Sequence, residues 1–456
     1  MSERLAAFRG RMAARSPESR LVAAFAGLIA VGTVLLSLPW SQRESVGVLD
    51  TLFTATSAVC VTGLVVVDTG TDYTVWGQIV ILLLIQAGGV GVMSFAALAF
   101  QFLGRRLSLS AQAALASSLL QREVASEFGG IFRRILGFVL TAEAAGALLI
   151  FIGMCPARGA AHAAYSAVFH SVSAFCNAGF SLYSDSLTAW RSNPVVTATV
   201  MVLIVLGGIG HPVAVDLWRL LLGARRREGS APKRLELNST VALATSGVLI
   251  LGGLFLLLVL GLAPGEDPWT TRAWSALFQS VTSRTAGFNT VDIGALPLSS
   301  LMLIMMLMFV GGSPGSCAGG IKTTTVTLWL ARLRSLLRGG EWPRLFGRHI
   351  PGEIARRASM IVGCAVVWNL FGSLLLLATE GASRGVGMHD VLFEQVSAFG
   401  TVGLSTGLTP KLSVAGKVWI IVTMFVGRLG PLTLAVWAFT HKAPGVRYPE
   451  GRIMIG

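Results

Sequence analysis

The sequence predicts an all-α membrane protein with four repeats of helix, pore loop and helix, so that eight transmembrane helices surround one central pore. Three observations lead to this prediction: the composition, a fourfold internal repeat and the distribution of Lys and Arg. Of the 456 residues, 53% are apolar and only 13% are charged, whereas soluble domains spend about a quarter of their residues on charge. Such a chain is expected to lie largely within a membrane.

The internal repeat rests on four short segments with the same beginning and the same end. Each begins with an apolar residue and Phe, and each ends in Gly followed by Leu or Phe. The segments are LFTATSAVCVTGL (52–64), VFHSVSAFCNAGF (168–180), LFQSVTSRTAGF (277–288) and LFEQVSAFGTVGL (392–404). A second glycine motif follows each of them, namely QAGGVG, LGGIG, VGGSPG and VGRLG. Two features that stay in register four times indicate a fourfold repeat.

Long apolar runs flank every short segment. A helix needs roughly 20 apolar residues to cross a membrane. Runs of that length precede the segments at 21–40, 132–154, 239–263 and 358–379, and follow them at 76–100, 194–222, 297–331 and 413–439. The segments themselves are too short to cross. Irregular backbone at membrane depth requires surrounding protein or a watery cavity, so each segment is expected to form a re-entrant half-helix and a loop.

These elements give the predicted organisation of the chain. Repeat one covers 21–104, repeat two 105–222, repeat three 235–334 and repeat four 350–440, with a basic segment at 1–20 and a tail at 441–456. The apolar run after residue 20 is long enough to remain as a span rather than to serve as a signal sequence.

Lys and Arg residues predict the orientation. Of 36 such residues, 26 fall in the predicted inner segments, 7 in the outer ones and 3 at membrane depth. Basic residues gather in cytoplasmic loops, so both termini are expected in the cytoplasm of a cell (inner) membrane protein, with all four loops facing outward. The net charge of +14 is explained in the same way, without a nucleic-acid partner.

The loops have the composition of an ion filter. Backbone carbonyls from four converging strands can replace the hydration shell of a cation, and glycine lets the backbone turn its carbonyls toward an axis. The predicted filter residues are Val61, Thr62, Gly63, Leu64, Asn177, Ala178, Gly179, Phe180, Thr285, Ala286, Gly287, Phe288, Thr401, Val402, Gly403 and Leu404. The alternative is that these glycines only allow close helix packing.

Enzyme chemistry is not indicated. There is no Ser/His/Asp, HExxH or paired-carboxylate arrangement, and the five cysteines are scattered. The GG-x-G clusters lie inside apolar spans rather than after a strand, so they are not nucleotide-binding loops. We expect neither an enzyme nor a metal site other than one for potassium.

The motifs SRTAGFNTVD, TVGLSTGLTP and VGRLGPLTL resemble the Trk/Ktr/HKT superfamily of potassium transporters, and most closely its Ktr-type membrane subunits. The resemblance runs from about residue 20 to the end, although the first loop, VTGL, matches more loosely. It implies one filter glycine per repeat, potassium as the transported ion and sodium as an activating ion. A serine in the first loop accompanies sodium selectivity in the plant branch, and here that position is Gly63. The loops lack the second glycine of the TVGYG signature, which implies looser discrimination.

The sixth predicted span is interrupted by GGSPGSCAGGIKTTT (Gly311–Thr325). Five glycines and a proline cannot maintain a helix, and the segment resembles the family's intramembrane gating loop. The predicted gate residues are Gly311, Gly312, Ser313, Pro314, Gly315, Ser316, Gly319, Gly320, Lys322 and Arg428. Lys322 is expected either to donate to this loop or to extend toward the cytoplasm.

Charged groups at membrane depth are functional by default. Arg428 stands where the other repeats have glycine and is expected to limit cation passage; the alternative is an ion pair with Glu143 or Asp216. Arg284 is expected to brace the third loop through carbonyl groups or through Asp292 or Glu394. Glu143 is a candidate buried partner for a filter loop or a helix end.

The predicted cytoplasmic loops are too short to fold into a regulatory domain. The resemblance implies a homodimer in the lipid membrane, controlled by a cytosolic nucleotide-binding ring of the Ktr A type. A secondary transporter of another cation or small solute, working by alternating access, is the main alternative, because broken spans also occur in transporters.

Overall fold

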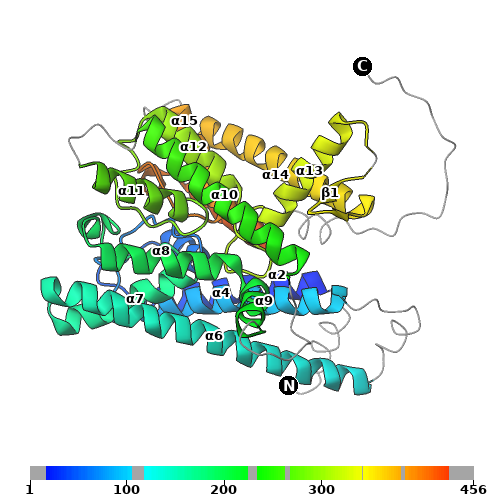
Figure 1. The fold of residues 1–456 in the computed structure, drawn as a ribbon. Coiled ribbons are helices and arrows are strands. Elements are labelled where there is room, and N and C mark those ends of the chain that lie inside the picture. Colours follow the sequence, from blue (N-terminus) through cyan, green and yellow to red (C-terminus); the bar gives the residue numbers. More distant parts are fainter. Residues whose placement is uncertain are drawn as a thin grey trace.

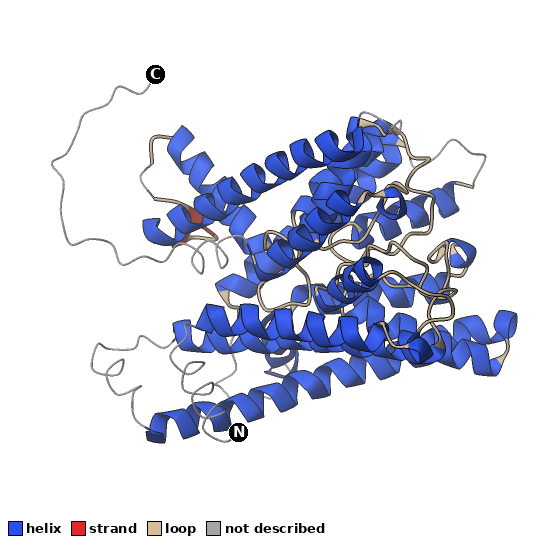
Figure 2. Cartoon of the chain, turned by 180° about the vertical axis from the view of Figure 1, so that it is seen from behind, coloured by secondary structure: helices blue, strands red, loops and turns tan. Residues whose placement is uncertain are grey.

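The computed structural model describes residues 17–104, 118–223, 234–261, 268–340, 342–381 and 386–430 (Figure 1). The predicted tail at 441–456 and most of the basic segment at 1–20 lie outside the described residues. Helices dominate the described chain, and the loops between them gather in the interior (Figure 2).

The helices follow one another in four groups, and the second helix of each group, called here the short helix, has 12 to 16 residues. The first group is α2 (Pro17–Leu36), α3 (Val48–Val59) and α4 (Val75–Gly104). The second is α6 (Ser118–Arg158), α7 (Ala160–Phe175), α8 (Pro194–Ile209) and α9 (His211–Gly223). The third is α10 (Leu237–Leu260), α11 (Trp269–Thr282), α12 (Leu298–Phe309) and α13 (Thr323–Leu337). The last is α14 (Gly352–Leu376), α15 (Met388–Gly400) and α16 (Val414–Leu429).

Several of these helices are long and apolar enough to cross a membrane. Within the described residues these are Val75–Phe95 of α4, Gly129–Arg158 of α6, α10, and Gly352–Gly381, which begins with α14. The bent pair α8 and α9 makes a fifth candidate. The prediction of a helical membrane protein is confirmed.

Two details of the prediction are wrong. The run at 194–222 is not one straight span, because α8 ends at Ile209 and α9 leaves at 101°. Gly210 has a φ of +81°, and Pro212 has no N–H with which to continue the hydrogen bonds of α8. The all-α prediction also misses a small antiparallel hairpin, in which β1 (Arg344–Leu345) pairs with β2 (Arg348–His349).

The four short helices pack in a closed order. Helix α7 packs against α4, α11 against α8, α15 against α12, and α3 against α16. The short helix of each group therefore packs against the third helix of the group before it. The third helix of the last group, α16, packs against the short helix of the first group, α3, and this contact closes the order. An ion pair strengthens this closure, since Lys417 Nζ of α16 lies 2.5 Å from Asp50 Oδ1 of α3. This order brings the C-terminal ends of the four short helices, and the loops that follow them, to a common centre.

Candidate functional site

Four glycines, one after each short helix, form a closed ring. A Cβ atom added to Gly63 would lie 3.1 Å from the Cα of Gly179, and one added to Gly179 would lie 3.1 Å from the Cα of Gly287. The same holds from Gly287 to Gly403 at 3.1 Å, and from Gly403 back to Gly63 at 2.9 Å. These contacts are tight, and the added Cβ atoms would lie still closer, at 2.1–2.5 Å, to carbonyl oxygens of the neighbouring loops, so only glycine fits at these positions.

A carbonyl oxygen lies at each step of this ring. The residue before each glycine places its carbonyl against the glycine of the neighbouring loop, where an added Cβ would collide with it. The four carbonyls belong to Thr62, Ala178, Ala286 and Val402. The amide N–H groups of the same residues donate back to the short helices, for example from Thr62 to the Ser57 carbonyl at 2.8 Å. The N–H groups are thus satisfied within each loop, and the carbonyls meet around the ring.

The backbone of three loops is strained. Val61, Asn177 and Thr401 have φ values of 54°, 60° and 48°. A positive φ costs a non-glycine residue on the order of 1–3 kcal/mol and is found mainly at functional sites. The third loop is one residue shorter from its Phe to its Gly, and none of its non-glycine residues has a positive φ. The sequence did not indicate these positive φ values, because Val and Thr rarely adopt them.

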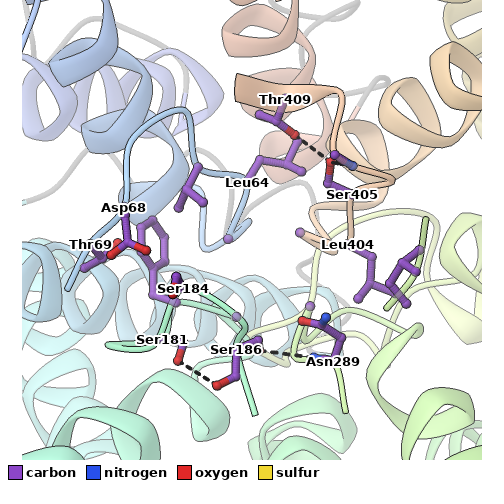
Figure 3. A pocket seen from close by; sticks show the side chains of 18 of the residues that line it. Leu64, Asp68, Thr69, Ser181, Ser184, Ser186, Asn289, Leu404, Ser405 and Thr409 are labelled. Atoms are coloured by element: carbon purple, nitrogen blue, oxygen red, sulfur yellow. Dashed lines mark hydrogen bonds between the residues drawn. The ribbon is translucent and has the colours of Figure 1, made fainter. Parts of the chain in front are cut away.

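A cavity of about 280 Å³ opens on one side of the ring (Figure 3). Of the predicted filter residues, the ones that line it are Gly63, Leu64, Gly179, Phe180, Gly287, Gly403 and Leu404. The others, namely Val61, Thr62, Asn177, Ala178, Thr285, Ala286, Phe288, Thr401 and Val402, are not part of its lining. They are buried in the structure.

Two carboxylates also line this cavity, and the sequence reasoning missed their role. Asp68 and Asp292 each stand five residues after a ring glycine. This equal spacing was the signal that could have identified them. Asp68 Oδ1 accepts hydrogen bonds from the backbone N–H groups of Gly70 at 2.7 Å and Thr71 at 3.0 Å. The negative charges of the Asp68 and Asp292 carboxylates favour cations in the cavity beside the ring.

The predicted break between α12 and α13 is a compact loop at 310–322, called here the 310–322 loop. Its ends form a parallel bridge between Val310 and Ile321. It attaches to the end of α8, because Ser313 N donates to the Gly208 carbonyl at 2.9 Å and Cys317 N to the Gly207 carbonyl at 3.1 Å.

The 310–322 loop also lies against the base of the fourth filter loop. A Cβ on Gly320 would be 3.3 Å from the Cα of Gly400, and a Cβ on Gly319 would be 2.9 Å from Cγ2 of Thr401. The predicted gate glycines Gly311, Gly312 and Gly315, together with Ser313, Pro314 and Ser316, lie in the same loop. The loop therefore joins the second and the fourth groups of helices next to the ring.

Two basic side chains hold this loop. Arg428 of α16 is buried and donates through Nη1 to the Cys317 carbonyl and through Nη2 to the Gly88 carbonyl, the latter at 2.8 Å. Lys322 Nζ donates to the Ala318 carbonyl within the loop, which is the first of the two expected placements.

The alternative of an ion pair for Arg428 is wrong for the described chain. The carboxylate of Glu143 accepts from Gln86 Nε2 at 3.0 Å, and that of Asp216 accepts from the backbone N–H of Glu236 at 2.9 Å. Glu143 lies beside the end of α7, where its backbone carbonyl accepts from Ser171 Oγ at 2.6 Å. Its carboxylate lies near the end of α7, 3.9 Å from Sγ of the C-cap residue Cys176, and its expected role as a partner for a filter loop or a helix end stays a prediction.

The expected carboxylate partners of Arg284 are not the ones observed. Arg284 Nη2 donates to Ser246 Oγ at 3.1 Å and to the Gly311 carbonyl at 3.3 Å. It thus braces the start of the 310–322 loop and not the third filter loop. Asp292 Oδ1 instead accepts from the Gly294 N–H at 2.9 Å.

Glu394 supports the fourth filter loop. Its fully buried carboxylate accepts from Thr409 N at 3.1 Å, from Thr409 Oγ1 at 2.9 Å and from the Ser405 hydroxyl. The Ser405 and Thr409 hydroxyls are also joined to each other (Figure 3). The segment after Gly403 is therefore fastened to α15.

Replacing Glu394 by Gln should destabilise the protein. All three donors reach the same oxygen, Oε1, so the oxygen of Gln can still accept from them, but without the negative charge that makes such hydrogen bonds roughly twice as strong. The weaker bonds cost about 1–3 kcal/mol in total. We expect a lower melting temperature in detergent, measured by intrinsic fluorescence. The matched control is Glu353→Gln in the exposed pair with Arg357, where surface pairs contribute at most about 1 kcal/mol. Equal melting temperatures for the two variants would contradict the assigned role of Glu394.

Among the described residues, no three His, Cys, Asp or Glu side chains are placed to hold a metal ion together.

Comparisons with known proteins show the family and the fold of the chain. The sequence profile of the TrkH family, described as "Cation transport protein", matches residues 9–444. The chain is 36% identical over 448 residues to the Ktr system potassium uptake protein B of Bacillus subtilis (strain 168), covering 97% of each chain. It is 37% identical over 450 residues to the potassium/sodium uptake protein NtpJ of Enterococcus hirae, again covering 97% of each. The crystal structure of the potassium transporter TrkH from Vibrio parahaemolyticus has the same fold, with a TM-score of 0.73 at 19% identity, over 94% of this chain and 86% of that one.

Proposed function

The chain belongs to the TrkH family of cation transport proteins, and from this premise we propose that it takes up potassium through the ring of Gly63, Gly179, Gly287 and Gly403. The family is one of ion transport proteins and not of enzymes. The observation that carries the proposal is the closed order of the four glycines, in which each is in contact distance of the next loop's carbonyl.

The proposed filter works by replacing water with backbone oxygens. A dehydrated potassium ion needs several oxygen ligands at once, and the carbonyls of Thr62, Ala178, Ala286 and Val402 stand at the four steps of the glycine ring. The short helices add to the attraction, because their C-terminal ends carry partial negative charge. The remaining filter residues, from Val61–Leu64, Asn177–Phe180, Thr285–Phe288 and Thr401–Leu404, are proposed to hold this geometry or to extend the ion path.

We propose that the four groups of helices are pseudo-repeats that provide eight membrane crossings. The closed packing order of α3, α7, α11 and α15 supports the repeats. The proposed second crossing of repeat three consists of α12, the 310–322 loop and α13. The excess of Lys and Arg in the inner segments supports cytoplasmic termini and outward-facing filter loops in the cell membrane.

The 310–322 loop is the proposed gate. It packs against the fourth filter loop and is tethered by Arg428, Lys322 and Arg284. The names of two relatives, a Ktr system protein B and a Ktr system protein D of Bacillus subtilis, support a separate regulatory subunit. The proposed assembly is a homodimer controlled by a cytosolic nucleotide-binding ring, with sodium as an activating ion. The name of the Enterococcus relative describes the uptake of potassium and sodium.

Potassium flux into proteoliposomes tests the proposal. Liposomes that contain the purified full-length chain should take up potassium, or its analogue rubidium, down an imposed gradient, faster than empty liposomes do. Saturable exchange of a small solute without any potassium current would favour the alternating-access transporter and would overturn the channel-like mechanism.

A further inference from the structure

Two thiols and a thioether from three separate segments meet beside α4. Cys176 caps the end of α7, Cys317 belongs to the 310–322 loop, and Met93 lies on α4. The distance from Cys317 Sγ to Met93 Sδ is 3.1 Å. A Cβ on Gly89 of α4 would lie 2.9 Å from Cys176 Sγ and 3.4 Å from Cys317 Sγ. Both thiols therefore reach the same point on α4.

This sulfur cluster is buried but has polar neighbours. All three side chains are fully buried. Cys176 Sγ faces the oxygens Gln86 Oε1 at 3.4 Å and Glu143 Oε1 at 3.9 Å. The cluster connects the end of α7, which precedes the second filter loop, to the proposed gate. Gly89 has no side chain, so the two cysteine sulfur atoms can approach α4 at this position.

Sulfur ligands select soft cations. Thiolates and thioethers bind Cu(I) and similar ions, whereas potassium and sodium prefer oxygen. A soft monovalent ion needs only two or three ligands, so two cysteines and one methionine suffice. We expect the ion to reach the cluster from the path proposed for potassium, because Cys176 directly precedes the predicted filter segment 177–180.

We propose that Cys176, Cys317 and Met93 form a binding site for a soft monovalent cation, Cu(I) or Ag(I), which fastens the 310–322 loop to α7 and α4. The inference rests on the proposed function, because Cys317 lies in the proposed gate. Binding involves no redox step: two S–H bonds break, two metal–thiolate bonds form together with one bond from the lone pair of the Met93 thioether, and two protons leave to water. The resulting complex has one negative charge, and the guanidinium of Arg428, bound to the Cys317 carbonyl, provides the opposite charge.

Silver ions provide the probe. Potassium flux is measured in proteoliposomes that contain the full-length chain, with and without micromolar silver nitrate in a chloride-free buffer. The wild-type protein should lose flux by about tenfold or more, which corresponds to about 1.4 kcal/mol in favour of the fastened loop. Cys176→Ser, Cys317→Ser and the double variant should each keep most of their own silver-free flux when silver is added. Met93→Leu should need more silver for the same inhibition.

The matched control is Cys364→Ser, which removes an exposed thiol on α14 and should respond to silver as the wild type does. A second measurement does not depend on transport: one equivalent of silver should raise the melting temperature of the wild type but not that of the double variant. A double variant that is as sensitive as the wild type in both measurements would overturn the site. If the wild type conducts no potassium but shows the thermal shift, the proposed function fails and the metal site stands.

Discussion

Replacing Gly403 by Ser should sharply reduce the preference for potassium over sodium. The added Cβ would lie 2.9 Å from the Cα of Gly63 and closer still to the carbonyl of Thr62. That carbonyl is one of the four proposed ligands, so it must move away from the ring. The backbone at Gly403 also has a φ of +93°, which adds strain on the order of 1–3 kcal/mol for a residue with a side chain. A change of about 1.4 kcal/mol between the two ions lowers their flux ratio roughly tenfold.

The measurement is the ratio of rubidium to sodium uptake in proteoliposomes. A matched control is Gly261→Ser at the end of α10, where φ is +86° but no atom lies within 4 Å of an added Cβ. This variant carries the same backbone strain without the collision, so its ion ratio should equal that of the wild type. An unchanged ratio in a well-folded Gly403→Ser protein would contradict the filter assignment.

Replacing Arg428 by Ala should raise cation flux in the absence of any activating partner. The side chain now holds the carbonyls of Cys317 and Gly88, and thus ties α16, the 310–322 loop and α4 together. A buried carbonyl that loses its donor costs about 1–3 kcal/mol, which weakens the position that the loop occupies. A shift of about 1.4 kcal/mol toward an open loop gives roughly tenfold more resting flux.

A lysine at position 428 separates the two ways in which this arginine can act. Lys keeps the positive charge but loses the planar fork that reaches two carbonyls. If charge alone limits the current, Arg428→Lys should conduct as little as the wild type. If the tether matters, as we expect, its resting flux should lie between the wild type and Arg428→Ala. Lower resting flux in a folded Arg428→Ala protein would reverse the assigned role, and Arg272→Ala, an exposed arginine on α11, is the control.

The sequence was sufficient to predict the ring glycines because the same local pattern recurs four times. A short helix, a glycine and a following apolar residue appear at similar intervals, and the structure places those glycines side by side. The break of the sixth predicted span was predictable for the same reason, since several glycines and a proline act on the helix that contains them.

Features that depend on contacts between distant segments were not predictable. The bend at Gly210 involves the N–H of His211 and the carbonyl of Gly315, which are far apart in the chain. The hydrogen bond from Arg284 to the Gly311 carbonyl, in place of an ion pair with a carboxylate, likewise depends on how distant segments pack. The sulfur cluster joins Cys176 to Cys317 across different helix groups, and nothing in the spacing of the cysteines indicates it.

The most direct test of the central claim is to locate the bound ion. A structure of the full-length protein, crystallised with thallium or rubidium in place of potassium, would show the ion by its anomalous scattering. The account predicts a peak at the centre of the ring, within coordination distance of the carbonyls of Thr62, Ala178, Ala286 and Val402. An empty ring, with the ion bound elsewhere in the chain, would contradict it.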